Sequence, residues 1–355
     1  TITTGLALSS MATNIKVGAG GFYALISRSL GIEVGGAIGI PLFLSQALGV
    51  ALYIMGFTEV VGQFAPNVDS RLISSAVLAI LFILSYVGAK SAIKVQYVIM
   101  AIITFSLITF FLGSHAEFTP AQTLEKTPFW VVFAIFFPAV TGISSGASMS
   151  GDLVNPRKSI PRGILGGIAV GLVIYIAVTI GLHQLATQEQ LIENKLIMED
   201  ISVWGWAITA GVIGATLSSA LGSILGAPRV LMALAEDRIL PFAKVWTKRN
   251  KAGEPVFSLL LTAGIVEASI LLADLDTIAP LLTMFFLITY GIINLAVFIE
   301  QSIGITSFRP SFKVPSLVYL IGSTWCLAVM FLINPIFAGI ALFIIIAVYI
   351  VQLKR

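Results

Sequence analysis

Proline, glycine and hydroxyl residues interrupt an apolar stretch near the middle of the chain. The interrupting residues, all between positions 136 and 146, are Pro138, Thr141, Gly142, Ser144, Ser145 and Gly146. Because proline lacks a backbone N–H and glycine tolerates unwound backbone, free carbonyls and amides are expected to face one place. Interrupted apolar helices of this kind carry ion and substrate sites in membrane transporters. The alternative is a proline kink packed against neighbouring helices, and we favour the binding site.

A second group of small polar residues lies between positions 215 and 223. Adjacent Ser218 and Ser219 offer two hydroxyls, and the preceding turn offers carbonyls, to a small hard cation such as sodium. Serines in membrane helices more often bond to their own helix or hold two helices together. From these residues alone, the structural role is the favoured interpretation.

Two carboxylates and a glycine repeat also lie in apolar stretches. Glu59 lies near the outer end of its stretch, where a carboxylate is solvated or part of a gate. Glu267 lies well inside another, so it is a functional hypothesis, with a protonated residue at a lipid edge or helix interface as the alternative. Glycines 163, 167 and 171 recur every four residues, which predicts close helix packing.

The composition shows which elements must position these residues. Of the 355 residues, 57% are hydrophobic and 10% are charged, whereas soluble domains have roughly 45–50% apolar and about 25% charged residues. A water-soluble protein is therefore excluded. The net charge of +3 is too small for a nucleic-acid-binding face. The single Cys326 permits no intrachain disulfide, and with two histidines it provides no metal-ligand spacing.

Ten stretches are apolar enough to cross a bilayer, which requires roughly 20 residues. They are residues 35–61, 72–88, 95–113, 129–148, 163–185, 204–226, 256–273, 278–298, 317–333 and 335–353. Residues 1–13 resemble the tail of a helix, and residues 228–255 are expected to form the longest loop. No linker divides the chain, so residues 1–355 are expected to form a single transmembrane transporter domain.

Lysine and arginine residues predict the orientation of the chain. Placing loops on alternate sides puts 17 of the 20 basic residues on one side, and only Arg71, Lys126 and Lys195 on the other. Cytoplasmic loops are enriched in basic residues, so the first side is expected to be cytoplasmic. The sequence thus predicts a multi-pass cell membrane protein whose C-terminus is cytoplasmic.

Several segments together resemble the cation-chloride cotransporter family, of the sodium-potassium-chloride type, within the amino acid-polyamine-organocation superfamily. They are residues 20–31, 133–138 continuing through 150–153, 227–229, 285–290 with Asn294, and 308–313. The resemblance implies an all-α membrane protein with the LeuT-like fold, in which two inverted five-helix repeats precede two further helices. In register with that fold, helix one, part of helix two and the C-terminal cytoplasmic domain are expected to be absent. The short stretch 188–203 and the lack of Asn-X-Ser/Thr sites favour a prokaryotic homologue.

The resemblance also implies roles for individual residues. Potassium would be held by Tyr53, the Pro138 carbonyl and Thr141. Chloride would be held by the amides of Gly142, Ile143 and Ser144 with the Tyr290 hydroxyl, which agrees with the tendency of helix N-termini to bind anions. Sodium would be held by Ala215, Ser218 and Ser219, which makes a sodium site the favoured role for the paired serines. Glu59 would belong to the outer gate, opposite an arginine on the first helix.

The function implied is secondary active symport of chloride with sodium, potassium or both, by alternating access. No bond chemistry and no cofactor are involved, so the chain is not expected to be an enzyme. The expected partners are the three ions and the lipid bilayer, with a homodimer through the last two spans as a family-level expectation. The alternatives are an amino acid permease, in which the interruption binds a carboxylate, and a non-transporting membrane scaffold or regulatory homologue.

Overall fold

The computed structural model describes residues 1–14, 21–114, 128–144, 153, 155–194, 196–303, 310–312 and 314–353. These residues are nearly all helical. The helices are α1 (Ile2–Asn14), α2 (Gly21–Leu30), α3 (Ile32–Val61), η1 (Gly62–Phe64), α4 (Ser70–Val87), α5 (Ala89–Phe111), α6 (Phe129–Phe136), η2 (Phe137–Val140), α8 (Pro156–Leu185), α9 (Gln188–Glu193), α10 (Ile197–Ile201), α11 (Gly205–Glu236), α12 (Ala243–Trp246), α13 (Val256–Leu272), α14 (Leu275–Ile303), α15 (Ser316–Ile333) and α16 (Pro335–Leu353).

Some sequence predictions fall outside these residues. They concern residues 145–152, which complete the interruption and the segment that resembles the cotransporter family. They also concern one of the two histidines, His115, and some of the basic residues used to predict the orientation, which are Lys16, Lys126, Lys195, Arg309, Lys313, Lys354 and Arg355.

Seven helices in the described part of the chain are long and apolar enough to cross a membrane. They are α3 with η1, α4, α8, α11, α14, α15 and α16. Three shorter apolar segments, Val95–Phe111, Phe129–Val140 and Val256–Leu272, lie where the other three spans were expected. The prediction of a helical multi-pass membrane protein is therefore confirmed, and the opening residues form a helix, α1, as expected.

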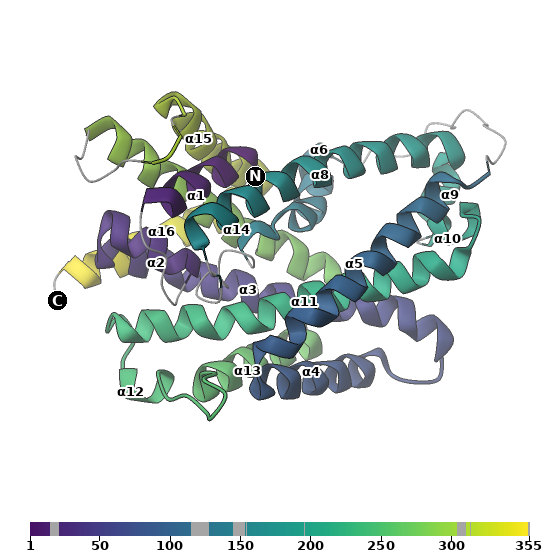
Figure 1. Ribbon diagram of the computed structural model, residues 1–355, viewed down its shortest axis with the longest axis horizontal. Coiled ribbons are helices and arrows are strands. Elements are labelled where there is room, and N and C mark those ends of the chain that lie inside the picture. Colours follow the sequence, from purple (N-terminus) through teal and green to yellow (C-terminus); the bar gives the residue numbers. More distant parts are fainter. Residues whose placement is uncertain are drawn as a thin grey trace.

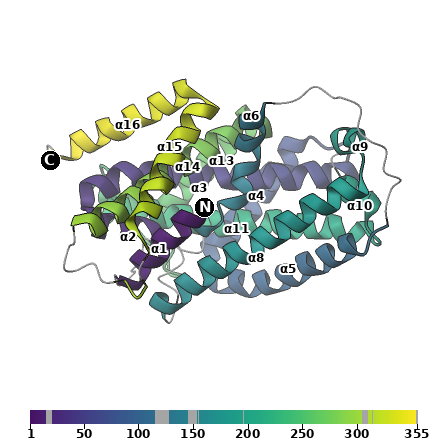
Figure 2. The same cartoon turned by 90° about the horizontal axis from the view of Figure 1, so that it is seen from above.

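The long helices run side by side along the long axis of the molecule (Figure 1). Helices α9 and α10 lie at one end, and α2 lies at the other in both views, with α12 beside the same end (Figures 1 and 2). At the centre, α3 packs against α11, α14, α2 and α13. In its most apolar stretch of 18 residues, 72% of the residues are buried. The core of the molecule therefore forms around α3.

Glycines explain how closely α3 approaches its neighbours. A Cβ added at Gly39 would lie 2.5 Å from a methyl of Leu234 on α11 and 2.9 Å from the Tyr23 ring on α2. Real Cβ atoms essentially never approach that closely, so a larger residue here would require Leu234 and Tyr23 to shift. Small residues permit such close helix packing within membranes.

One predicted boundary was wrong. Residues 228–236 were expected to begin the longest loop, but α11 continues through Pro228 to Glu236. The residues after the proline, including Val230 and Leu234, are buried in the core that α11 shares with α3. Their burial outweighs the cost of about 3 kcal/mol that a proline imposes inside a helix. The loop before α13 therefore comprises residues 237–255.

Candidate functional site

The predicted interruption is present, and it begins where α6 ends. The α-helix stops at Phe136, and residues 137–140 form the tighter 3-10 turn η2, so the Thr141 amide bonds to the Pro138 carbonyl at 3.3 Å. The chain turns at Gly142 and is helical again at residues 143 and 144. The carbonyls of η2 therefore lack the regular α-helical partners that a bilayer would otherwise require.

Side-chain hydroxyls from three other helices, or from residues next to them, compensate for this break. They donate to carbonyls of the last turn of α6 and of the interruption. The bonds are Thr283 to Ala134 at 2.6 Å, Tyr175 to Ala139 at 2.8 Å, Tyr290 to Thr141 at 2.8 Å and Thr1 to Val140 at 3.3 Å. Sequence reasoning missed Tyr175 and Thr283. The signal was a hydroxyl within an apolar span, which is too common to point to any particular carbonyl.

The three residues expected to hold potassium lie together. The Thr141 hydroxyl donates to the Pro138 carbonyl at 2.7 Å, and the Tyr53 hydroxyl is hydrogen-bonded to the Thr141 side chain. Tyr53 reaches this place from the second half of α3, so packing of α3 against the interruption assembles the group. Two hydroxyls and a carbonyl are neutral oxygen ligands of the kind that hard cations prefer.

The four residues expected to hold chloride also lie together. Tyr290 is fully buried, and its hydroxyl donates to the Thr141 carbonyl and contacts the Ser144 side chain. The Ser144 amide faces the same carbonyl at 3.4 Å. Within the described residues, the Gly142 and Ile143 amides donate no hydrogen bond. These two N–H groups lie where the chain becomes helical again at residues 143 and 144, and amides at the start of a helical turn favour an anion.

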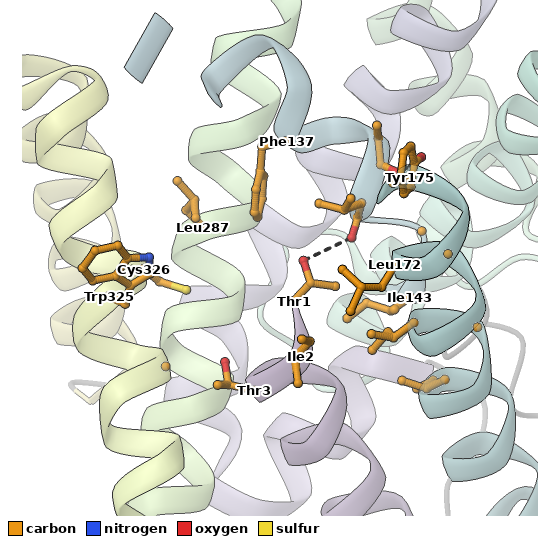
Figure 3. Close-up of a pocket in the computed structure, with 18 of the residues that line it drawn as sticks. Thr1, Ile2, Thr3, Phe137, Ile143, Leu172, Tyr175, Leu287, Trp325 and Cys326 are labelled. Carbon is orange, nitrogen blue, oxygen red and sulfur yellow. Dashed lines mark hydrogen bonds between the residues drawn. The ribbon is translucent and has the colours of Figure 1, made fainter. Parts of the chain in front are cut away.

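A cavity of about 960 Å³ opens beside the interruption (Figure 3). Residues of α1, α6, η2, α8, α14 and α15 line it, and most of the lining side chains are apolar. Phe137 points into it from η2, Leu287 from α14 and Tyr175 from α8, while Thr1 bonds to the Val140 carbonyl at its edge (Figure 3). Among the described residues, the lining contains no charged side chain. An apolar cavity of this size beside free backbone groups is typical of a ligand site.

Within the described part of the chain, the glycine repeat in α8 does not pack against another helix, contrary to the prediction. A Cβ added at Gly163, Gly167 or Gly171 would meet nothing within 4 Å, and all three glycines line the cavity. The four-residue spacing places them on one face of α8, as expected. That face borders open space because the tertiary arrangement puts no other described helix against it.

The three residues expected to hold sodium all lie on α11. Ala215 and Ser218 are half-buried, but Ser219 is exposed. The Ser218 hydroxyl donates to Oε1 of Gln96 on α5 at 3.1 Å, and Nε2 of Gln96 lies 3.5 Å from the Ser218 carbonyl. Sequence reasoning missed Gln96, although an amide inside an apolar span was a signal.

The two carboxylates occupy different environments. Glu59 is exposed in the last turn of α3, where its part in a gate remains a prediction. Glu267 is half-buried on α13, and its Oε1 accepts a hydrogen bond of 2.7 Å from Ser75 on α4. The structure therefore supplies the partner that the sequence could not name. This contact fits a carboxylate at a helix interface.

Comparison with known proteins places the chain in a family. A family model described as amino acid permease matches residues 1–354. Solute carrier family 12 member 2 of Mus musculus is 34% identical over 421 aligned residues, which cover 99% of this chain and 35% of the mouse protein. Solute carrier family 12 member 1 of Homo sapiens is 34% identical over 402 residues, covering 93% of this chain and 36% of the human protein. Member 2 of Homo sapiens is 33% identical over 99% of this chain and 34% of its own length.

The resemblance inferred from the sequence is confirmed by these matches, although the chain spans about a third of the length of the curated relatives. The matched proteins are permeases and solute carriers rather than enzymes. Matches over nearly the whole chain show that it belongs to the amino acid permease family.

Proposed function

We propose that the protein carries out secondary active symport of chloride with sodium, potassium or both. The observation that carries this proposal is the convergence at Thr141. Its hydroxyl lies with Tyr53 and the Pro138 carbonyl, while its own carbonyl contacts Tyr290 beside the amides of Gly142 and Ile143. Oxygen ligands for a cation and N–H donors for an anion thus adjoin a single residue.

Electrostatics supports joint binding of the two ions. The described side chains that line the adjoining cavity carry no formal charge, so a single ion entering this apolar region would lose hydration without a side-chain countercharge. A cation and chloride bound on the two sides of Thr141 would attract each other strongly in a medium of low dielectric constant. The pair carries no net charge, and this favours coupled, electroneutral transport over movement of either ion alone.

The donors have to rearrange for ions to bind. The Thr141 hydroxyl now bonds to Pro138, and the Tyr290 hydroxyl bonds to the Thr141 carbonyl. Rotation of the Tyr290 O–H toward chloride would release that carbonyl. Alternating access would then come from rocking one group of helices against another around the interruption, with Glu59 at the outer gate.

Transport by the purified protein in proteoliposomes tests the proposal. We expect chloride uptake to depend on an inward sodium or potassium gradient and to be insensitive to membrane potential. Protein-free vesicles supply the background, and Tyr290→Phe should raise the chloride concentration that gives half-maximal uptake. Chloride uptake that did not change with either cation gradient would contradict coupling. Lack of uptake of any solute would favour the non-transporting scaffold.

A second candidate function is amino acid transport. The cavity of about 960 Å³ beside Gly142 is larger than bare ions need, and its size favours an amino acid as the substrate. The substrate carboxylate would accept hydrogen bonds from the Gly142 and Ile143 amides, and the apolar side chain of the substrate would occupy the cavity. Calorimetric titration with apolar amino acids distinguishes the two candidates: tight binding without a halide effect would reverse our ranking.

The finer fold and assembly are also proposals. We infer the LeuT-like arrangement of two inverted five-helix repeats followed by α15 and α16, within a single transporter domain. The helix order and the interruption after α6 support it. A homodimer through the last two helices agrees with the exposed apolar side chains of α16, including Ile336 and Phe343.

A further inference from the structure

A polar contact joins α5 to α11 beside the candidate sodium residues. The Ser218 hydroxyl donates to Oε1 of Gln96 at 3.1 Å, and the Gln96 amide reaches back to the Ser218 carbonyl at 3.5 Å. Both side chains are half-buried within apolar helices. A single glutamine therefore contacts both oxygens of a residue that the proposed function gives to sodium.

Close packing of the two helices holds Gln96 in place. Next to the contact, a Cβ added at Gly214 of α11 would lie 3.2 Å from Ile99 of α5. Further along, a Cβ at Gly211 would clash with Ser106 of α5. Spacings of three and seven residues place Gly211, Gly214 and Ser218 on one face of α11. The Gln96 contact thus continues a tightly packed seam.

The chemistry of a hydroxyl ligand explains why Ser218 needs such a partner. A serine hydroxyl binds a cation through its lone pairs, so its hydrogen must point away from the cation to an acceptor. Without a neighbour, a serine in a membrane helix donates to a carbonyl of its own preceding turn. Here the Ser218 hydroxyl donates its hydrogen bond to the Gln96 Oε1 atom instead, so both lone pairs of the Ser218 hydroxyl oxygen face away from that bond.

We propose that Gln96 is a positioning residue for sodium: it orients the Ser218 hydroxyl and holds the Ser218 carbonyl while the cation binds on the other side of Ser218. This inference rests on the proposed sodium-coupled function. A neutral amide suits the task because it orients the ligand without adding a formal charge, so the cation's charge is left to be balanced by chloride.

The test measures chloride uptake by the reconstituted protein against sodium concentration. Gln96→Leu removes the acceptor and should raise the sodium concentration for half-maximal uptake about 2- to 12-fold, the factor expected for one neutral hydrogen bond. The maximal rate at saturating sodium and the half-saturating potassium concentration should stay unchanged. Gln96→Glu keeps an acceptor at the same place, so its half-saturating sodium concentration should lie below that of Gln96→Leu.

Matched controls separate positioning from general damage. Thr216→Val on α11 and Thr104→Val on α5 remove hydroxyls that bond to their own helices, and neither should change sodium dependence. The double variant Gln96→Leu with Ser218→Ala should be no weaker than Ser218→Ala alone, because both changes remove one contact.

The outcomes are distinct. A wild-type protein indifferent to sodium would overturn both the proposed sodium coupling and this inference. A sodium-dependent wild type whose Gln96 variants share its half-saturating concentration would overturn the inference alone. Equal weakening of sodium and potassium dependence in Gln96→Leu would also overturn it, because that pattern indicates a structural role.

Discussion

Thr141 is the residue at which the two halves of the candidate site meet. It is 1% exposed, its hydroxyl donates to Pro138, and its carbonyl accepts from Tyr290. Of the donors to this buried carbonyl, the Tyr290 hydroxyl makes the shortest bond, so it stabilises the interruption as well as offering an anion ligand. A single tyrosine therefore couples the stability of the interruption to occupancy of the site.

Replacing Tyr290 tests this coupling. Tyr290→Phe removes one donor of the Thr141 carbonyl, which keeps contacts with the Ser144 amide and hydroxyl, so we expect a loss of about 0.5–1.5 kcal/mol in the free energy of unfolding. Thermal unfolding in detergent measures the loss as a lower Tm. Tyr97→Phe, a change at an exposed tyrosine on α5, is the control. A Tm equal to that of the control would show that the carbonyl does not need the Tyr290 hydroxyl.

At the scale of elements, α2 is fastened to the end of α11 by a tyrosine. Tyr23 is 1% exposed and its hydroxyl donates to Oδ2 of Asp237 at 2.6 Å. Burial, and then the hydrogen bond to Asp237, raise the pKa of Tyr23 well above its ordinary value. The other end of the loop before α13 is held by Asn250, which donates to the Tyr86 carbonyl at 2.7 Å. These contacts tie α2, α4 and α11 together.

The Tyr23 contact predicts a pH dependence of stability. Below pH 10, the ordinary tyrosine pKa, Tyr23 is neutral in both the folded and unfolded states, so its contribution is fully present. Above pH 10 the unfolded chain loses this proton while the folded protein keeps it, so the contribution falls as pH rises. Tyr23→Phe should therefore be less stable than wild type by a constant amount below pH 10, and the difference should shrink above it.

Denaturant unfolding at several pH values measures this difference. Tyr86→Phe, at a tyrosine whose side chain is 43% exposed, is the control and should match the wild type. Asp237→Asn should reproduce the loss at neutral pH by weakening the same contact. A difference between wild type and Tyr23→Phe that did not change above pH 10 would contradict the assignment.

At the scale of the whole molecule, charge divides the two ends. The loop of residues 237–255 carries five basic residues and lies at the end occupied by α2 and its Arg28. The opposite end, formed by α9 and α10, carries Glu189, Glu199 and Asp200 (Figure 1). Basic residues accumulate on cytoplasmic loops, so the α2 end is the expected cytoplasmic side.

Cysteine labelling in intact cells tests the orientation. In a Cys326→Ala background, which removes the sole cysteine, an impermeant maleimide added outside should label Glu189→Cys. It should label Ala252→Cys only after the membrane is permeabilised. Both positions are exposed, so access depends on the side of the membrane rather than on burial. Labelling of Ala252→Cys in intact cells would reverse the orientation.

The sequence by itself determined the membrane class, the positions of most helices and the interruption after Phe136. Hydrophobic length and the chemistry of Pro138 and Gly142 are local properties, readable without knowing any neighbour. Long-range contacts were different. Neither the continuation of α11 through Pro228 nor the open face along Gly163 could be read locally, because each depends on which helix packs, or does not pack, against it.

For the candidate site, the resemblance placed Tyr53, Thr141 and Tyr290 in one group, and the structure brings these residues together. For other polar groups, only the tertiary structure supplied the hydrogen-bond partners. These are Gln96 for Ser218, Ser75 for Glu267 and Tyr175 for the Ala139 carbonyl. The physical reason is that residue type specifies what a group can donate or accept. Which donor meets which acceptor is decided by the packing of helices far apart in the sequence.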